Sequence, residues 1–167
     1  MKGKNSLRAI MAVDDKGGVS KNGIMPWPKN SNDLRWFKKN TNKNVVIMGR
    51  LTWEDSFMPS PLPNRINVLI SSHQKSKFPG ADEYIDKNII EGVKKISEKY
   101  QDYYKWIIGG PNIINQLFNF IEIFYLTRIY GDFNCDKNLD LNNIYKSMQL
   151  IEKINCDKTC HFEIWER

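Results

Sequence analysis

The chain has 167 residues, of which 41% are hydrophobic and 26% are charged. This length and composition are typical of one soluble domain over residues 1–167, and the apolar runs are too short to span a membrane, so we expect no membrane association. The net charge of +6 suits nucleic acid or an anionic small ligand, but the lysines are scattered rather than clustered, and we expect no nucleic-acid binding.

The hydrophobic pattern predicts alternating strands and helices. Runs rich in Val, Ile and aromatic residues predict strands at 7–13, 45–48, 66–70, 106–108, 123–130 and 162–165. Apolar positions at helical spacing predict helices over 31–40, which includes an N-cap residue, 89–100 and 112–120. This alternation indicates an α/β sheet.

Two stretches rich in glycine and proline interrupt these elements. Residues 14–30 hold three glycines and two prolines, and an irregular stretch of this length is usually functional or disordered. Residues 58–64 hold three prolines, which stiffen the stretch and end the short helix expected before it. We therefore expect the first stretch to be a functional loop.

Asp33 is the first candidate functional residue. It stands four residues before Phe37 in the predicted helix, so a carboxylate and an aromatic ring share the inward face. The acid could complement the helix dipole in the first turn. It could also be a buried acid that holds a cationic or hydrogen-bond-donating ligand, with a pKa set by that burial. Both interpretations stay open from these residues alone.

Two strand-to-helix junctions carry residues suited to phosphate. In Val45 to Trp53 a strand leads through glycine to Arg50 and a threonine, and a guanidinium is a bidentate partner for phosphate oxygens. In Trp106 to Asn112 a strand leads through paired glycines to Pro111 at a typical first helical position. A surface arginine or a tight turn would explain either junction alone, and neither matches the G-x-G-x-x-G fingerprint. Together they favour a ligand with several phosphates.

Nine short segments, taken in chain order, resemble the dihydrofolate reductase family along nearly the whole chain. No single segment is decisive, but all nine follow the family's order with near-family spacing. They are Ala12-Val13-Asp14, Met25-Pro26-Trp27, Asp33-Leu34-x-Trp36-Phe37-Lys38, Val46-Ile47-Met48-Gly49-Arg50-x-Thr52-Trp53-Glu54, Pro61-Leu62-Pro63-x-Arg65, Ile70-Ser71-Ser72, Ile108-Gly109-Gly110, Tyr125-Leu126-Thr127 and Phe162-Glu163.

The resemblance implies the family's fold and reaction. The fold would be an α/β one, an eight-stranded, mostly parallel sheet with an antiparallel C-terminal strand and four flanking helices. The reaction would be the NADPH-dependent reduction of 7,8-dihydrofolate to 5,6,7,8-tetrahydrofolate, with hydride added to pterin C6. Asp33 would accept hydrogen bonds from the pterin 2-amino and N3 groups, supported by Thr127. Water admitted beside Met25 and Trp27 would carry the proton to N5.

The resemblance also implies how substrate and cofactor are held. Phe37, Leu62 and Ile108 would line an apolar slot for the pterin and p-aminobenzoyl rings, and Arg65 would pair with the glutamate carboxylate. The loop at 14–30 would close over the nicotinamide, and Arg50 would favour NADPH over NADH by binding the 2′-phosphate. The implied cofactor residues are Ile10, Ala12, Val19, Ser20, Gly23, Gly49, Arg50, Leu51, Thr52, Ser71, Ser72, Gly109, Gly110, Pro111, Asn112, Ile113 and Ile114.

The sequence departs from the family pattern at several positions. Ser20 stands where many members carry glycine, and Ile114 where a tyrosine often lies near the nicotinamide. Arg8 replaces a usually apolar residue of the first strand. Two alternatives therefore stay open. A reductase of a related pterin or pyrimidine substrate on the same fold is disfavoured by Asp33 together with Trp27 and Arg65, and a non-catalytic folate binder is disfavoured by Asp33 and Thr127.

The cysteines bear on location and metal binding. Cys135, Cys156 and Cys160 are an odd number, at spacings that match neither a disulfide framework nor a zinc ribbon. No export signal is evident at the start of the sequence. We therefore expect reduced thiols, a cytoplasmic location and no metal site, with a monomer as the default assembly.

Overall fold

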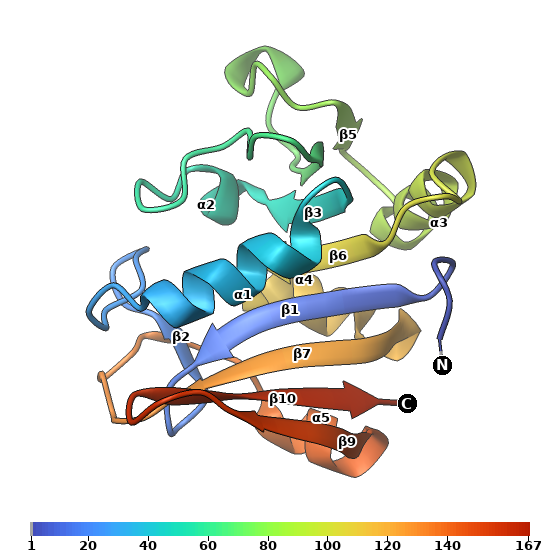
Figure 1. The fold of residues 1–167 in the computed structure, drawn as a ribbon. Helices are drawn as coiled ribbons and strands as arrows, with labels where there is room; N and C mark the ends of the chain where they lie inside the picture. Colours follow the sequence, from blue (N-terminus) through green and yellow to red (C-terminus); the bar gives the residue numbers. More distant parts are fainter. Residues whose placement is uncertain (1) are drawn as a thin grey trace.

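The computed structural model describes residues 2–167 and is built on a central eight-stranded sheet (Figure 1). The strands follow the order β5-β4-β3-β6-β1-β7-β10-β9. Their bounds are β1 Leu7–Val13, β3 Val45–Gly49, β4 Ile66–Ile70, β5 Glu83–Ile85, β6 Lys105–Gly109, β7 Ile121–Ile129, β9 Gln149–Asn155 and β10 Cys160–Glu166. A separate two-stranded sheet pairs β2 Gly18–Ser20 with β8 Lys137–Asn138.

The strand directions confirm the expected mixed sheet. Strand β1 lies between β6 and β7 and runs parallel to both, and β3, β4 and β5 continue the parallel arrangement. Strand β10 runs antiparallel to both β7 and β9. Every residue of β3 and β6 is buried, as expected of parallel strands that are covered on both faces.

Helices cover both faces of the sheet (Figure 1). Four of them have seven or more residues, as the resemblance implied. The helical segments are α1 Ser31–Thr41, α2 Arg50–Trp53, α3 Ile89–Lys99, α4 Pro111–Leu117 and α5 Leu141–Ser147, with 3-10 turns at Lys75–Lys77 and Phe118–Phe120. The described residues form two large core clusters and a smaller third one. Side chains of α3, α4 and α5 pack in one large cluster, and side chains of α1 pack against the other large cluster and the small one.

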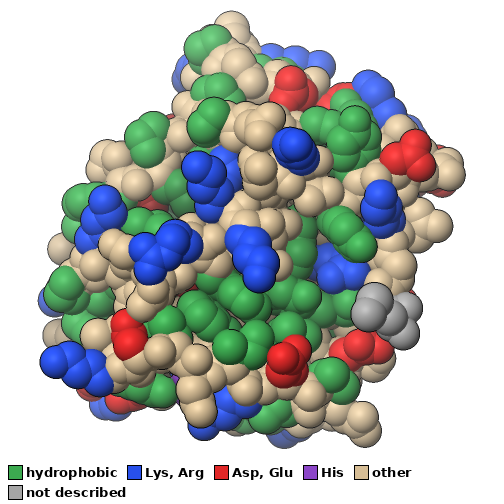
Figure 2. Space-filling model, in the orientation of Figure 1, with side chains coloured by type: hydrophobic (Ala, Val, Ile, Leu, Met, Phe, Trp, Pro, Cys, Tyr) green, Lys and Arg blue, Asp and Glu red, His purple; other side chains and the backbone are tan. Residues whose placement is uncertain are grey.

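The alternation of side chains along β1 explains these two cores. Ala9 and Met11 point into the cluster that holds α3, α4 and α5, whereas Ile10 points into the cluster beneath α1. Apart from Arg8, strand β1 is therefore apolar on both faces. Figure 2 shows the α1 face, where Lys and Arg side chains are spread apart rather than gathered in one block. None of the helices within residues 2–167 is long and apolar enough to cross a membrane.

Helix α1 begins differently from the sequence prediction. Its N-cap is Asn30, one residue before the predicted range, and the Asn30 side chain accepts a hydrogen bond from the backbone N–H of Asp33. The predicted helix over 112–120 ends at Leu117 and continues as a 3-10 turn. These differences shift element boundaries and leave the order of elements unchanged.

Arg8 has a structural explanation that its sequence position did not suggest. Its guanidinium carbon lies 4.5 Å from the ring centre of Tyr104 and 5.5 Å from that of Trp106. One guanidinium nitrogen also donates to the backbone carbonyl of Lys2 at 2.9 Å. The charge is thus placed over two aromatic faces, an arrangement that stabilises a buried guanidinium.

Candidate active site

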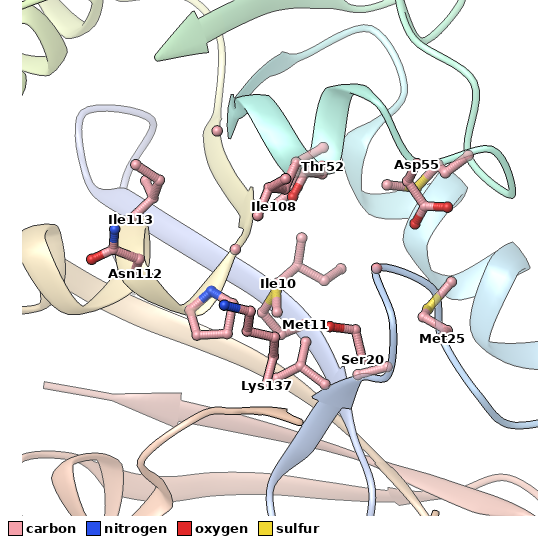
Figure 3. Close-up of a pocket in the computed structure, with 18 of the residues that line it drawn as sticks. Ile10, Met11, Ser20, Met25, Thr52, Asp55, Ile108, Asn112, Ile113 and Lys137 are labelled. Atoms are coloured by element: carbon pink, nitrogen blue, oxygen red, sulfur yellow. The ribbon is translucent and has the colours of Figure 1, made fainter. Parts of the chain in front are cut away.

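A cavity of about 410 Å³ opens where the carboxyl ends of β1, β3 and β6 meet the starts of the helices (Figure 3). Open α/β sheets commonly bind ligands in such a crevice. One wall comes from β1 through Ile10, Met11 and Ala12, and another from α1 through Asp33, Leu34 and Phe37. The lining is mostly apolar, with few polar groups, as in small-molecule sites.

Asp33 is the acid at the apolar end of this cavity. The residue is 8% exposed and lies in the first turn of α1. Burial raises the pKa of its carboxyl above the ordinary value, and the hydroxyl of Thr127 on β7 opposes part of that rise. The structure thus supports the buried-acid interpretation of Asp33 that the sequence left open.

Thr127 is buried beside Asp33 with an unsatisfied hydroxyl. The residue is 1% exposed, and its Oγ1 makes no hydrogen bond of normal geometry with any described residue. Leaving a buried polar atom unpaired costs about 1–3 kcal/mol. Such an atom, set behind an acid of the cavity lining, can support the polar contacts that the acid makes with a ligand.

Two glycines let the ends of β3 and β6 approach their neighbours closely. A Cβ atom on Gly49 would lie 3.0 Å from Cγ1 of Ile113. Gly109 has φ +135°, and a Cβ there would lie 3.0 Å from Oγ1 of Thr52. Gly110 lines the cavity and has open space around the position of a Cβ, so its backbone is free to approach a ligand.

Two basic side chains line the same cavity. Arg50, at the start of α2, forms an ion pair of 2.9 Å with Glu54 four residues later. Lys137 comes from β8 and lines the cavity together with Gly110 to Ile113 of the junction between β6 and α4. The cavity therefore has cations near its glycine-lined part and an acid at its apolar part, an arrangement that would orient an elongated, asymmetric ligand.

The loop at 14–30 is partly ordered by contacts with the segment after β7. Asp14 is 1% exposed and accepts hydrogen bonds from the backbone N–H groups of Lys16, Gly18 and Phe133 at 2.8–3.0 Å. Burial alone would raise the pKa of Asp14, but these bonds hold it below its ordinary value. Pairing of β2 with β8 adds a second connection, so the loop is anchored at its base.

Cys135 lies beside this anchor. Its Sγ is 3.6 Å from a carboxylate oxygen of Asp14. Burial, followed by the nearby negative charge of Asp14, raises the pKa of the Cys135 thiol to about 11. The thiol therefore stays protonated at neutral pH, which favours the interpretation of Cys135 as a small packing residue rather than a reactive one.

Most residues expected at the site from the sequence line the cavity together. From the catalytic and substrate sets these are Met25, Asp33, Phe37 and Ile108. From the cofactor set they are Ile10, Ala12, Val19, Ser20, Gly23, Gly49, Arg50, Leu51, Thr52, Gly110, Pro111, Asn112 and Ile113. The loop, the first strand and both strand-to-helix junctions thus converge on one cavity.

Other expected residues lie behind or beside the cavity wall. Trp27 packs edge-on against Phe133, and Leu62 packs in the core beneath α1. Ile114 is completely buried in the opposite core, and its N–H donates to the carbonyl of Gly110. The expected residues outside the immediate lining are Trp27, Leu62, Arg65, Ser71, Ser72, Gly109, Ile114 and Thr127.

Arg65 and Ser71 are held by contacts outside the lining. Arg65 donates from Nε to Oγ1 of Thr41 at 3.2 Å, and its guanidinium lies 5.8 Å from the ring centre of Phe37, a lining residue. Burial lowers the pKa of the Arg65 guanidinium below its ordinary value. Ser71, at the end of β4, accepts a hydrogen bond from the N–H of His73.

Several lining residues were missed in the sequence. Met11, Leu34 and Ile70 adjoin predicted residues, so the extended and helical patterns around those positions could have suggested them. The segment 136–138 joins the site only through its pairing with β2, which no local pattern reveals. The missed set is Met11, Leu34, Asp55, Met58, Ile70, Asp136, Lys137 and Asn138.

Comparison with known proteins agrees with this geometry. A family model described as dihydrofolate reductase matches residues 6–167. The chain belongs to the dihydrofolate reductase family. It is 32% identical over 146 residues to dihydrofolate reductase of Sus scrofa, with 78% of this chain and 76% of the relative covered. It is 31% identical over 130 residues to dihydrofolate reductase of Bacillus subtilis, with 77% and 72% covered.

A solved structure supports the same assignment of fold. Dihydrofolate reductase from Enterococcus faecalis, complexed with NADP(H) and RAB-propyl, superposes with a TM-score of 0.83 at 25% identity. The match covers 100% of this chain and 99% of that structure. The expected dihydrofolate reductase fold is thus confirmed, and the family's reaction is an oxidoreduction that uses NADPH.

Proposed function

We propose that this cavity is the active site for NADPH-dependent reduction of 7,8-dihydrofolate to 5,6,7,8-tetrahydrofolate. The observation that carries the proposal is the buried Asp33 carboxyl in the lining of an apolar cavity, with the unpaired hydroxyl of Thr127 behind it. A pterin offers hydrogen-bond donors to such an acid and a flat apolar surface to the walls around it. Family membership supports the same substrate.

Asp33 would fix the orientation of the pterin. Its carboxylate would accept hydrogen bonds from the 2-amino and N3 groups, and Thr127 would support that arrangement. Phe37 and Ile108 line the slot for the rings, while Leu62 and Arg65 stand next to Phe37 for the rest of the substrate. Arg65 would pair with the glutamate carboxylate, because a guanidinium binds a carboxylate through two parallel hydrogen bonds.

The residues around the part of the cavity that Gly49 and Gly110 line fit a dinucleotide. Gly110 leaves room for close approach of a phosphate, and Arg50 and Lys137 supply positive charge. Thr52 lines the same region, and Ser71 and Ser72 lie past the end of β4 for the adenosine phosphates. Ile10, Ala12, Val19, Ser20 and Gly23 would surround the nicotinamide between β1 and the loop at 14–30.

The chain's own residues would manage the proton, while bound NADPH supplies the hydride that adds to pterin C6. Asp33 lies on the far side of the pterin ring from N5 in the proposed orientation, so a water beside Met25 and Trp27 would deliver the proton. The loop that carries Met25 would exclude bulk solvent during the transfer. The contacts of Asp14 and of β2 with the segment after β7 hold the base of that loop.

We also propose that the chain acts as a monomer of one domain, in the cytoplasm and without nucleic acid. All three cysteines are free, as expected for a protein of the cytoplasm. The spread of Lys and Arg over the α1 face supports a small anionic ligand rather than a polyanion (Figure 2). Reduction of a related pterin or pyrimidine on the same fold is the alternative, and Asp33 argues against it.

The decisive experiment follows NADPH absorbance with and without dihydrofolate. We expect dihydrofolate-dependent oxidation of NADPH, and a loss of about a hundredfold or more in kcat/KM for Asp33→Asn, because the amide cannot hold the pterin as the carboxylate does. Asp55→Asn is the matched control, since Asp55 is a second acid in the lining. Its kcat/KM should fall by less than about tenfold. Unchanged turnover in Asp33→Asn would remove Asp33 from the mechanism, and preference for another pterin would favour the alternative.

A further inference from the structure

A second cluster of chemically active side chains lies outside the active site, in the turn between β9 and β10. Cys156, Asp157 and Cys160 each present one ligand atom, and these three atoms lie within 4.8 Å of one another. Cys160 is fully buried, Cys156 is half-buried and Asp157 is exposed. We propose that this turn is a binding site for a thiophilic divalent metal ion, Zn²⁺ or Cd²⁺, held by two thiolates and one carboxylate.

The geometry of the turn fits a small tetrahedral ion. Two thiolates bound to zinc at about 2.3 Å lie about 3.8 Å apart, so each ligand atom here needs to move by at most about 1 Å. The two cysteines flank a turn of three residues, and Cys160 is the first residue of β10. Three protein ligands with an exposed carboxylate leave a fourth position for water, as in open zinc sites.

Hydrogen bonds already hold the turn in the required shape. Oδ1 of Asp157 accepts from the backbone N–H groups of Thr159 at 2.7 Å and Cys160 at 3.3 Å. Its other oxygen, Oδ2, accepts from Nδ2 of Asn32 at 2.7 Å, a contact that an incoming ion would replace. The carboxylate is thus fixed beside the two sulfurs, which reduces the ordering that metal binding would require.

The donor set selects the kind of ion. Two thiolates favour soft or borderline ions such as Zn²⁺ and Cd²⁺ over Ca²⁺ and Mg²⁺, which prefer oxygen ligands. The neighbouring His161 is not a fourth ligand, because one ring nitrogen lies 2.8 Å from Glu163 and the other 2.8 Å from the hydroxyl of Tyr130. Side chains at 160 and 161 also point to opposite faces of β10.

The site is connected to the helix that carries Asp33. Asn30, the N-cap of α1, donates through Nδ2 to Oγ1 of Thr159 at 3.0 Å, and Asn32 in the first turn donates to Asp157. Coordination through Oδ2 of Asp157 would compete with the Asn32 contact. Occupation of this site is therefore expected to loosen the contact between the turn and the start of α1, which lies next to the active site.

Metal binding here should depend strongly on pH. Cysteine binds a metal ion as the thiolate rather than as the thiol. An incoming ion must displace the thiol protons, and the apparent affinity should rise by about tenfold per pH unit for each proton released. The groups facing the pair are Asp157, Thr159 and the side-chain amide of Asn30.

Titration of the whole chain with Cd²⁺ tests the proposal, in a phosphine reductant that keeps the thiols reduced. We expect one Cd²⁺ per chain with a thiolate-to-metal charge-transfer band in the ultraviolet, and competition by Zn²⁺. Cys156→Ser should weaken binding by about tenfold or more and remove about half of the band. Cys135→Ser is the matched control and should leave both unchanged, because the Cys135 sulfur contacts Asp14 and is not one of the three grouped ligand atoms.

Two further variants test the other two proposed ligands. Asp157→Asn keeps one side-chain oxygen that can accept the hydrogen bonds of the turn, but it removes the negative charge. It should weaken Cd²⁺ binding by about tenfold. Cys160 is fully buried, so its replacement by serine can unfold the protein. The Cd²⁺ affinity of Cys160→Ser is therefore compared with that of the parent chain only after circular dichroism and NADPH binding show that the variant is folded. Equal Cd²⁺ affinity in Cys156→Ser and the parent chain, or no charge-transfer band in the reduced parent chain, would overturn the proposal. None of these readouts depends on turnover, so the proposed enzymatic function is tested separately.

Discussion

The hydroxyl of Thr127 lowers the pKa of the Asp33 carboxyl, which burial otherwise raises. The two side chains come from β7 and α1, so the packing of α1 on the sheet determines the acidity of the proposed catalytic residue. Thr127 Oγ1 makes no hydrogen bond of normal geometry within residues 2–167, and it is therefore available to both the acid and a ligand.

Thr127→Val should separate these two roles because valine keeps the shape and removes the hydroxyl. Without the hydroxyl, the pKa of Asp33 should rise further. We expect the apparent pKa that belongs to Asp33 in the pH profile of kcat/KM to move to higher pH, with activity lower by about tenfold. Thr127→Ser keeps the hydroxyl and should leave that pKa near its parent value. A pH profile that is the same for Thr127→Val and the parent chain would contradict the role assigned to Thr127.

Asp33 should also destabilise the ligand-free fold. Because its pKa is raised above 3.8 in the folded state, the folded state favours the protonated form, and ionisation costs stability above the folded pKa. That penalty disappears as the pH falls through the folded pKa toward 3.8. We expect Asp33→Asn to raise the free energy of unfolding at pH 7, with the gain shrinking toward pH 4, as measured by urea denaturation. A gain that stayed constant across this range would show that burial of the charge is not its cause.

The N-cap of α1 gives a second stability prediction. Asn30→Ala removes the bond from the side chain to the N–H of Asp33 and the bond to Thr159, and should cost about 0.5–2 kcal/mol of unfolding free energy. Ser31→Ala is the control, because Ser31 is exposed and lies inside the helix rather than at its cap. If Ser31→Ala cost more than Asn30→Ala in urea denaturation, the cap would be at Ser31.

The sequence could predict those parts of the structure that have a local pattern, and it could not predict those that depend on residues distant in the chain. The buried strands and Asp33 carry local signals, since runs such as Val45–Gly49 are apolar throughout and Asp33 sits on an apolar helical face. Strand β9 is exposed at six of its seven positions, so its hydrophobic pattern is weak, and it forms by pairing with β10. Lys137 reaches the cavity from a two-residue strand, and Arg8 is accommodated by aromatic rings about 100 residues away, so neither could be placed by local patterns.

Gly109 and Gly110 should differ sharply in their response to alanine. At Gly109 the φ of +135° is strained for alanine, and the new Cβ would lie 3.0 Å from Thr52 Oγ1 and 3.4 Å from Met11 Sδ. We expect Gly109→Ala to cost about 1–3 kcal/mol of unfolding free energy. Gly110→Ala has open space and an ordinary φ, so it should keep stability within about 0.5 kcal/mol while weakening NADPH binding, because it lines the cavity. Equal losses of stability in the two variants would refute this distinction.

The two cations of the cavity should serve different parts of the cofactor. Arg50 stands at the start of α2, where we place the 2′-phosphate, whereas Lys137 comes from β8 and lines the same cavity as Gly110 and Pro111, where we place the pyrophosphate. NADH lacks the 2′-phosphate and keeps the pyrophosphate. Arg50→Gln should therefore weaken NADPH binding by about tenfold or more and leave NADH binding nearly unchanged, whereas Lys137→Gln should weaken both to the same degree.

Fluorescence titrations of both cofactors at two salt concentrations check this prediction. Each lost ion pair should also reduce the salt dependence of NADPH binding, because screening acts on exposed charge pairs. Lys146→Gln is the control, since Lys146 lies on α5, away from the cavity lining, and should change neither affinity. Glu54 pairs with Arg50, so Glu54→Gln should free the guanidinium and strengthen NADPH binding slightly without affecting NADH. If Lys137→Gln altered the preference between NADPH and NADH, Lys137 would instead belong with the 2′-phosphate.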